Sequence, residues 1–356
     1  MLAAMGTASL WQILFMIAAY SSALVCIYAT YRIGLEQGWR WGVIHLLIFG
    51  LFLVLFFVLE SWAASRTPYF SYPPPPQGFP DWIPFLKFVT APPKKLCTID
   101  VPPNLGIPIS VLLLETTLTF AAMHTARLLA STKDLSFRLL RPFMAALALL
   151  LLDFFLDPLA STSATCLATG GTQHTGLGFW GWYVLPEIGP DAFGVPLFNY
   201  VLWYSMPVIL VALVGLLGWF HDVYFDPLVV GPGTLTLKIL FEGAFLTLII
   251  FAFTLIIKVS PNFASLPIGT LRAIFVGVLL SNLLAILYYA RFFKYDNDFR
   301  WWFVYPQGVF LLFCVLAFLF SGLLSTKLPD LWIVVLIVSP LYLLWTLSPY
   351  LKKIWP

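Results

Sequence analysis

Charged side chains are scarce in this chain. Only 10% of its 356 residues are charged, with 19 Lys or Arg and 16 Asp or Glu, whereas 61% are hydrophobic. An ordinary soluble domain has about 25% charged residues. So few charges cannot cover the surface of a soluble fold, and a nucleic-acid-binding protein needs clustered basic residues. The sequence therefore predicts a polytopic membrane protein that contacts lipid and no nucleic acid.

Histidine clusters and phosphate-binding motifs are missing as well. The four histidines, His45, His124, His174 and His221, stand alone in the sequence. Membrane di-iron oxygenases and desaturases need clustered histidines, and zinc proteases need the pattern HExxH. Nucleotide-binding folds need a glycine-rich turn between a strand and a helix. The sequence therefore predicts no metal site and no cofactor.

The four cysteines do not form a disulfide framework. Cys26 and Cys314 lie within apolar runs, where a thiol behaves as a small hydrophobe. Cys97 and Cys166 lie in or near long connections between these runs. These two can pair in an oxidising compartment. The alternative is two unrelated thiols.

Long apolar segments dominate the chain. A membrane-spanning helix needs about 20 mostly apolar residues. Nine segments qualify: 9–28, 41–60, 107–126, 142–161, 197–220, 235–257, 273–290, 301–324 and 331–347. The last is short and contains Pro340, so eight spans followed by a re-entrant segment is the alternative. The predicted fold is an all-α polytopic transmembrane helix bundle of eight or nine spans.

Lys and Arg indicate the orientation of these spans. Cytoplasmic connections carry an excess of both residues, and the rule is weakest for long loops. With the N-terminus outside, most Lys and Arg fall on the cytoplasmic side, and most of the others lie in the long connection 61–106. We therefore expect an outer N-terminus and a cytoplasmic C-terminus. The proline-rich connection 61–106 and the connection 162–196, with its glycines and tryptophans, then both lie outside a single membrane domain, 1–356.

Five acidic residues lie inside these apolar segments: Glu60, Glu115, Asp153, Asp157 and Glu242. A carboxyl group at the centre of a bilayer costs about 2.5 kcal/mol or more, so each such residue marks a candidate functional site. With a helical rise of about 1.5 Å per residue, all of them except Glu242 converge on the outer half of the membrane. The two long connections lie above that place.

Asp153 and Asp157 are spaced i, i+4 and therefore share one helix face. Two carboxyls this close in a low dielectric cannot both be ionised, so we expect one of them to carry a proton. A protonated carboxyl beside a carboxylate is a general acid with a partner base. The alternatives are a hydrogen bond that holds helices together and a proton relay.

The segment 153–159 has a near-repeat at 222–228, which contains Asp222 and Asp226. Two acidic motifs can bridge magnesium to a diphosphate, as in membrane prenyltransferases. In the predicted topology these two motifs lie on opposite sides of the membrane. A magnesium-dependent prenyltransferase is therefore one alternative function. A non-enzymatic proton-coupled or lipid-binding membrane protein is another.

Residues 152–203 carry several motifs in a characteristic order. They read LDFFLDPLA and then, after an insertion, FWGWYV and FGVPLFNYVLW. This order resembles the integral-membrane carotenoid biosynthesis family of the gamma-carotene 1',2'-hydratase and bisanhydrobacterioruberin hydratase type. The matching residues are Asp153, Asp157, Pro158, Ala160, Trp180, Trp182, Gly194, Val195, Pro196, Asn199 and Trp203. Glu60 with the aromatic segment 69–72 is similar to an earlier part of the family pattern, and Phe193 and Leu202 depart from it.

The resemblance implies a cofactor-independent hydro-lyase of a prokaryotic cytoplasmic membrane. Such an enzyme adds water to a terminal isopropylidene double bond of a carotenoid or other isoprenoid, which it takes from the bilayer. The reaction needs an acid, a shielded tertiary carbocation and a water molecule. The expected catalytic residues are Asp153, Asp157, Glu60 and Glu115. The expected substrate-binding residues are Trp180, Trp182, Phe193, Pro196, Asn199 and Trp203, and the indole faces would stabilise the cation.

Overall fold

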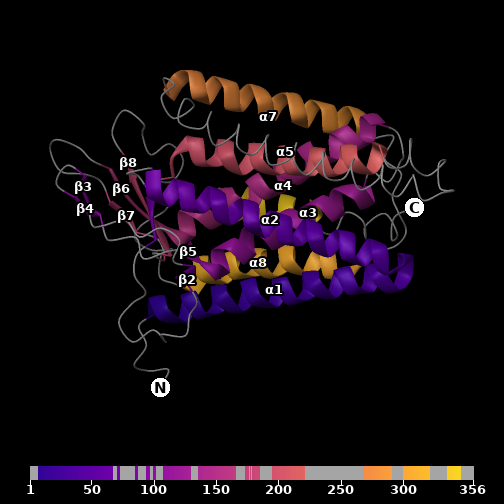
Figure 1. Ribbon diagram of the computed structural model, residues 1–356. Helices are drawn as coiled ribbons and strands as arrows, with labels where there is room; N and C mark the ends of the chain where they lie inside the picture. Colours follow the sequence, from indigo (N-terminus) through magenta and orange to yellow (C-terminus); the bar gives the residue numbers. More distant parts are fainter. Residues whose placement is uncertain are drawn as a thin grey trace.

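The computed structural model describes residues 7–66, 70–72, 85–86, 94–96, 99–101, 107–129, 135–165, 173–175, 177, 179–184, 195–220, 268–290, 300–320 and 335–345. Long helices lie side by side in this part of the chain, and short strands gather at one end of the bundle (Figure 1). Six helices are long and apolar enough to cross a membrane. They are α1 (Thr7–Gln37), α2 (Trp39–Arg66), α3 (Ile109–Leu129), α4 (Leu135–Ala160), α5 (Leu197–Phe220) and α8 (Trp301–Phe320). These helices indicate an integral membrane protein of the all-α bundle class.

The described parts of the predicted apolar segments are helical, except that residues 107–108 and Ser161 lie in strands. Helix α7 (Ile268–Ala290) and a short apolar helix, Val335–Trp345, account for two more of them. Segment 235–257 and Glu242 lie outside the described residues. Some boundaries were wrong: α1 continues to Gln37, and α4 begins at Leu135, so that Pro142 lies inside the helix. The described residues do not test the total of eight or nine spans or the outer position of the N-terminus, so both stay predictions.

Helix α3 lies at the centre of the bundle and is buried along almost its whole length. It packs against α1, α2, α4 and α8. Its buried side chains include polar ones: Ser110, Glu115, Thr116, Thr117, Thr119, His124 and Thr125. By contrast, α1 and α2 expose large apolar side chains such as Leu24 and Leu47. Apolar groups outside and polar groups inside suit a bundle whose solvent is lipid.

A single residue, Gly38, connects α1 to α2. Its φ of 100° lies in a region that L side chains rarely adopt, so glycine allows the chain to reverse there. The two helices then approach closely at a second glycine. A Cβ added at Gly42 would lie 2.8 Å from Gly34 Cα and 2.9 Å from the carbonyl oxygen of Thr30. Small residues at this crossing thus allow backbone-to-backbone contact, as in many membrane helix pairs.

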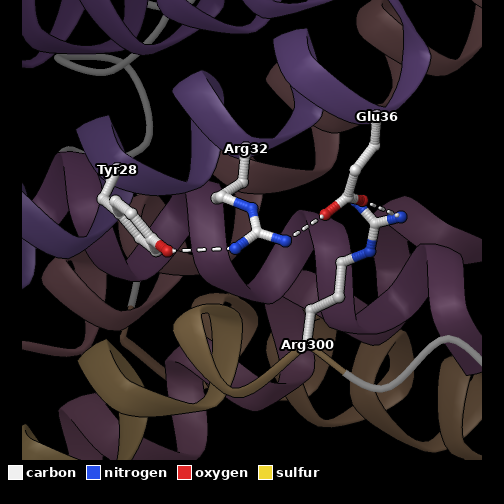
Figure 2. Close-up of polar contacts among 4 residues, drawn as sticks. All are labelled: Tyr28, Arg32, Glu36 and Arg300. Carbon is white, nitrogen blue, oxygen red and sulfur yellow. Dashed lines mark hydrogen bonds and ion pairs between the residues drawn. The ribbon is translucent and has the colours of Figure 1, made fainter.

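An ion pair between Glu36 of α1 and Arg300, directly before α8, joins these helices at the end of the bundle opposite the strands (Figure 1). Figure 2 shows the carboxylate of Glu36 between two guanidinium groups, 3.0 Å from Arg32 and 2.9 Å from Arg300. Arg32 also donates a hydrogen bond of 3.2 Å to the hydroxyl of Tyr28. Both guanidinium groups lie over the ring of Trp302, at 5.5 and 5.9 Å from its centroid. This network fixes the end of α1 against the start of α8.

The two long connections contain strands that an all-α prediction missed. The main sheet has the order β1 (Phe70–Ser71), β8 (Trp180–Val184), β6 (Ser161–Thr165) and β7 (Gln173–Thr175). Strand β8 is antiparallel to β1 and parallel to β6. Two further pairs are β2 (Phe85–Leu86) with β5 (Ile107–Pro108), and β3 (Lys94–Leu96) with β4 (Ile99–Val101). Each strand has at most five residues, and β1 and β8 are distant in sequence, so no local pattern indicated their pairing.

These strands also correct the boundaries of the predicted connections. Residues 61–66, assigned to the proline-rich connection, continue α2. Residues 162–165, assigned to the second connection, form β6, which follows α4 without a break. Cys97 and Cys166 lie outside the described residues, so their pairing stays open. Cys26 and Cys314 are buried free thiols, which confirms their prediction as small hydrophobes.

We expect the variant Gly42→Ala to lower the melting temperature of the protein in lipid nanodiscs. The added methyl group meets backbone atoms that cannot move aside, so α1 and α2 must separate, at a cost of about 1–3 kcal/mol. Gly50→Ala on the same helix is the matched control, because an added Cβ there meets no atom within 4 Å among the described residues. Equal melting temperatures for the two variants would contradict the close approach.

Candidate functional site

The last turns of α4 carry the two aspartates on which the site is built. Asp153 and Asp157 are 2% and 1% exposed, and they lie one helical turn apart, which confirms the shared face. The next residues, Ser161–Thr165, leave the helix as β6. The segment before β8 closes this helix end, because the N–H groups of Leu177 and Phe179 donate to the carbonyl oxygens of Leu159 and Ala160, both at 2.8 Å. The segment before β8 is thereby held against the end of α4 that carries Asp157.

Strand β8 provides two indole donors for Asp157. Its parallel pairing with β6 places Trp180 opposite Ser161 and Trp182 opposite Ser163. Side chains two residues apart on a strand point to the same face. The Nε1–H groups of Trp180 and Trp182 both donate to Asp157 Oδ1, at 2.6 and 3.0 Å. The sequence WGW thus directs two ring N–H donors to one oxygen of Asp157, a role that its prediction as a source of ring faces did not include.

Helix α5 contributes Asn199, which contacts both aspartates. The Nδ2 amide donates to Asp157 Oδ2 at 2.5 Å and lies 3.5 Å from Asp153 Oδ2. A side-chain hydrogen bond with Ser161 also reaches Asp157. Asp157 therefore accepts hydrogen bonds on both of its oxygens, and Asp153 has one long contact with the same amide. The two carboxyls have the same depth of burial but very different donor sets.

Glu60 and Glu115 form the second half of the carboxyl cluster. Glu60 is partly exposed near the end of α2, and Glu115, on α3, is 3% exposed. Their side chains are hydrogen-bonded to each other, which requires the two carboxyls to share a proton. Glu115 also lies close enough to Asp153 and Asp157 to interact electrostatically with both. The structure thus brings together the four carboxyls predicted to converge.

Tyr72 links the sheet to this cluster. It directly follows β1, which pairs with β8, and its side chain is 1% exposed. The hydroxyl donates to Glu60 Oε2 at 2.5 Å. Burial, together with the negative charges of Glu60, Glu115 and Asp157, raises the pKa of Tyr72 well above its ordinary value of about 10. Tyr72 therefore stays protonated and donating over the whole physiological range.

Of the predicted substrate-binding residues, Trp180, Trp182 and Asn199 lie in the cluster. Pro196 is buried at the start of α5, and Trp203 is half-buried one turn beyond Asn199 on the same helix. Phe193 lies outside the described residues. The prediction did not include Tyr72, Ser161 or Tyr200. Tyr72 was visible only as part of an aromatic segment, and Ser161 and Tyr200 only as neighbours in sequence of predicted residues.

Aromatic side chains surround the aspartates. Tyr200 is fully buried, stacks on Phe154 at 4.4 Å, and interacts electrostatically with both aspartates. On the other side Phe15 of α1 packs against Phe179 and Trp180, with ring centroids at 4.9 and 6.3 Å. Such a shell keeps the local dielectric low, which strengthens every electrostatic interaction inside it.

Two histidines form a separate group near the Glu36 end of the bundle. The rings of His45 and His124 stack at 5.2 Å, and His124 stacks on Phe303 at 4.0 Å. Within the described ranges, no group of three or more His, Cys, Asp or Glu side chains is arranged to hold a metal ion. Asp222 and Asp226 lie outside these ranges, so the magnesium-dependent alternative is untested.

Comparisons with protein-family models, with curated proteins and with solved structures return no match to this chain.

Replacing Asp157 with alanine should destabilise the protein far more than replacing it with asparagine. Asparagine keeps one acceptor oxygen for both indoles, whereas alanine leaves two buried N–H donors unpaired, at about 1–3 kcal/mol each. The measurement is the melting temperature in nanodiscs, with Asp153→Ala as the control because Asp153 has only the long amide contact among the described residues. Equal melting of the two Asp157 variants would refute the role of the indole bonds.

Tyr72 should make the stability of the protein depend on alkaline pH. Its pKa is about 10 in the unfolded chain and higher in the folded protein, so the unfolded chain loses the proton first. The contribution of Tyr72 is complete below about pH 10 and is lost as the pH rises further. The gap in unfolding free energy between wild type and Tyr72→Phe should therefore be constant below pH 10 and narrow above it. If the difference in unfolding free energy does not narrow between pH 10 and the pKa of Tyr72 in the folded protein, Tyr72 is not a buried donor.

Proposed function

We propose that this chain is a cofactor-independent hydratase of an isoprenoid polyene of the carotenoid type. It would act in a prokaryotic cytoplasmic membrane and take its substrate from the bilayer. The observation that carries the proposal is the unequal donor set of Asp153 and Asp157. Hydrogen-bond donors favour the charged form of a carboxyl. Asp157 is then the carboxylate, and Asp153, one turn away, holds the proton.

The first step uses the Asp153 proton. Asp153 protonates the less substituted carbon of the terminal isopropylidene double bond, and the π electrons form the new C–H bond. Positive charge develops on the tertiary carbon. The Asp157 carboxylate, already held by two indoles and an amide, needs no rearrangement to stabilise this charge. The aromatic shell of Phe15, Trp180 and Tyr200 shields the cation and adds favourable ring faces.

The second step adds water to the cation. A lone pair of the water oxygen forms the C–O bond, and the water gives up one proton to the Glu60–Glu115 pair. This pair shares one proton across its hydrogen bond, so it has room to accept a second. The product is a tertiary alcohol, and the cluster has given one proton and received one. Return of that proton to Asp153 completes the cycle without metal or redox chemistry.

A second candidate is a proton-coupled membrane protein without catalysis, favoured by the same hydrogen-bonded carboxyl pair. It predicts pH-dependent proton flux in proteoliposomes that is independent of any polyene. The Asp153→Asn and Asp157→Asn variants would abolish that flux.

The hydratase predicts a gain of one water in the pigments of a lycopene-producing host that expresses this chain. Mass spectrometry of the pigments, and incorporation of ¹⁸O from labelled water by purified protein in lipid, are the measurements. Asp153→Asn should lower the rate at least about 100-fold, the usual contribution of a general acid. Glu36→Gln, a matched carboxyl-to-amide change at the other end of the bundle, should leave it unchanged. Unmodified pigments with folded wild-type protein would refute the proposed function.

A further inference from the structure

Three polar atoms on one side of α3 have no hydrogen-bond partner among the residues that the structure describes. They are Glu115 Oε2, Thr116 Oγ1 and Thr119 Oγ1. The three residues are buried, with exposures of 3%, 0% and 0%. Buried side-chain polar atoms in proteins nearly always have a partner, and each one without costs about 1–3 kcal/mol. Three such atoms within little more than one helical turn therefore indicate a ligand.

Two other threonines of the same helix show that the missing bonds are not a general property of α3. The hydroxyl of Thr117 donates to the carbonyl oxygen of Leu114 at 3.1 Å, and that of Thr125 donates to Ala121 at 3.0 Å. This is the usual way in which a buried helical threonine pairs its hydroxyl. Thr116 and Thr119 do not pair in this way. Their hydroxyls are thus available to a group that lies against the helix.

The spacing of these residues fits one small ligand. Glu115 and Thr119 are four residues apart and Thr116 and Thr119 are three, so each pair lies on neighbouring positions of the helix surface, with Cβ atoms about 5–6 Å apart. The set offers one carboxyl acceptor and two hydroxyls that donate or accept. A buried water molecule needs two to four polar partners. No larger ligand is needed to satisfy these three atoms.

We propose that Glu115, Thr116 and Thr119 bind a water molecule, and that this is the water added to the substrate. The role of this water in the reaction rests on the proposed hydratase function. Glu115 Oε2 accepts a hydrogen bond from the water while its other oxygen is hydrogen-bonded to Glu60. One threonine hydroxyl donates to the water oxygen and the other accepts the second O–H of the water, which leaves one lone pair of the oxygen free. In the addition, the oxygen lone pair forms the C–O bond, one O–H bond breaks, and that proton passes to Glu115.

Thermal stability tests the binding of water without any use of activity. Thr116→Val and Thr119→Val remove the hydroxyls with little change in shape, and Thr119→Ser keeps the hydroxyl. If the hydroxyls hold water, each valine variant melts at or below the wild-type temperature, because a bound water loses a partner. If the hydroxyls are dry, valine removes an unpaired polar group and the melting temperature rises. A rise in both valine variants overturns the water site.

Steady-state hydration of a polyene tests the role of that water. Thr119→Val should lower kcat at least tenfold and leave KM for the polyene unchanged, because the polyene does not contact the threonine. Thr119→Ser should restore kcat to near the wild-type value. Thr117→Val is the matched control, since its hydroxyl is already paired with Leu114, and it should keep the wild-type kcat. An unchanged kcat in Thr119→Val overturns the assignment.

Different measurements distinguish failure of the proposed hydratase function from failure of the proposed water site. If the wild-type protein hydrates no polyene, the proposed function and the role of the water in it are refuted together. The melting temperatures of the valine and serine variants still decide whether Glu115, Thr116 and Thr119 bind water. If hydration occurs but valine at 116 and 119 raises stability and preserves kcat, the hydratase stands and the water site is refuted.

Discussion

The burial of Asp157 is the constraint on which the arrangement of the site depends. A carboxylate inside an apolar bundle is tolerated only when donors replace the water that it has lost. Here those donors come from a strand in one connection and from the start of α5, while the residue itself is on α4. The strand is held in turn by pairing with β6 and β1. Pairing this one buried carboxyl with its donors therefore requires two helices and a sheet to meet at one end of the bundle.

The four carboxyls at this end of the bundle have very different hydrogen-bond partners. Asp157 has indole, amide and hydroxyl donors, Asp153 has one distant amide, and Glu60 and Glu115 have each other. Neutral donors and shared protons are enough to accommodate these four carboxyls, so no basic side chain is needed beside them. A cluster of this kind can hold protons and negative charge together in a low dielectric.

Sequence alone was enough for the features that depend on local pattern. Apolar runs of about 20 residues predicted the helices, and α5 was predicted with its observed bounds. Because carboxyls are rare inside apolar segments, Glu60, Glu115, Asp153 and Asp157 could be selected as candidates. The rise per residue of a helix then predicted that they lie at a similar depth. What sequence did not show depends on contacts between distant segments. The pairing of β1 with β8 places Tyr72 beside the cluster, and the ion pair of Glu36 with Arg300 joins segments that are far apart in the chain.

The donors of Asp157 have a consequence for how the protein is made. Trp180, Trp182 and Asn199 follow Asp157 by 23, 25 and 42 residues. In a chain synthesised from its N-terminus, α4 therefore reaches the membrane ahead of the segments that carry these donors. Burial without donors favours the neutral form of both aspartates, and the leucine-rich run that precedes them offsets the cost of placing them in the membrane. The full set of donors to Asp157 is thus acquired late, when the second connection folds back over the end of α4.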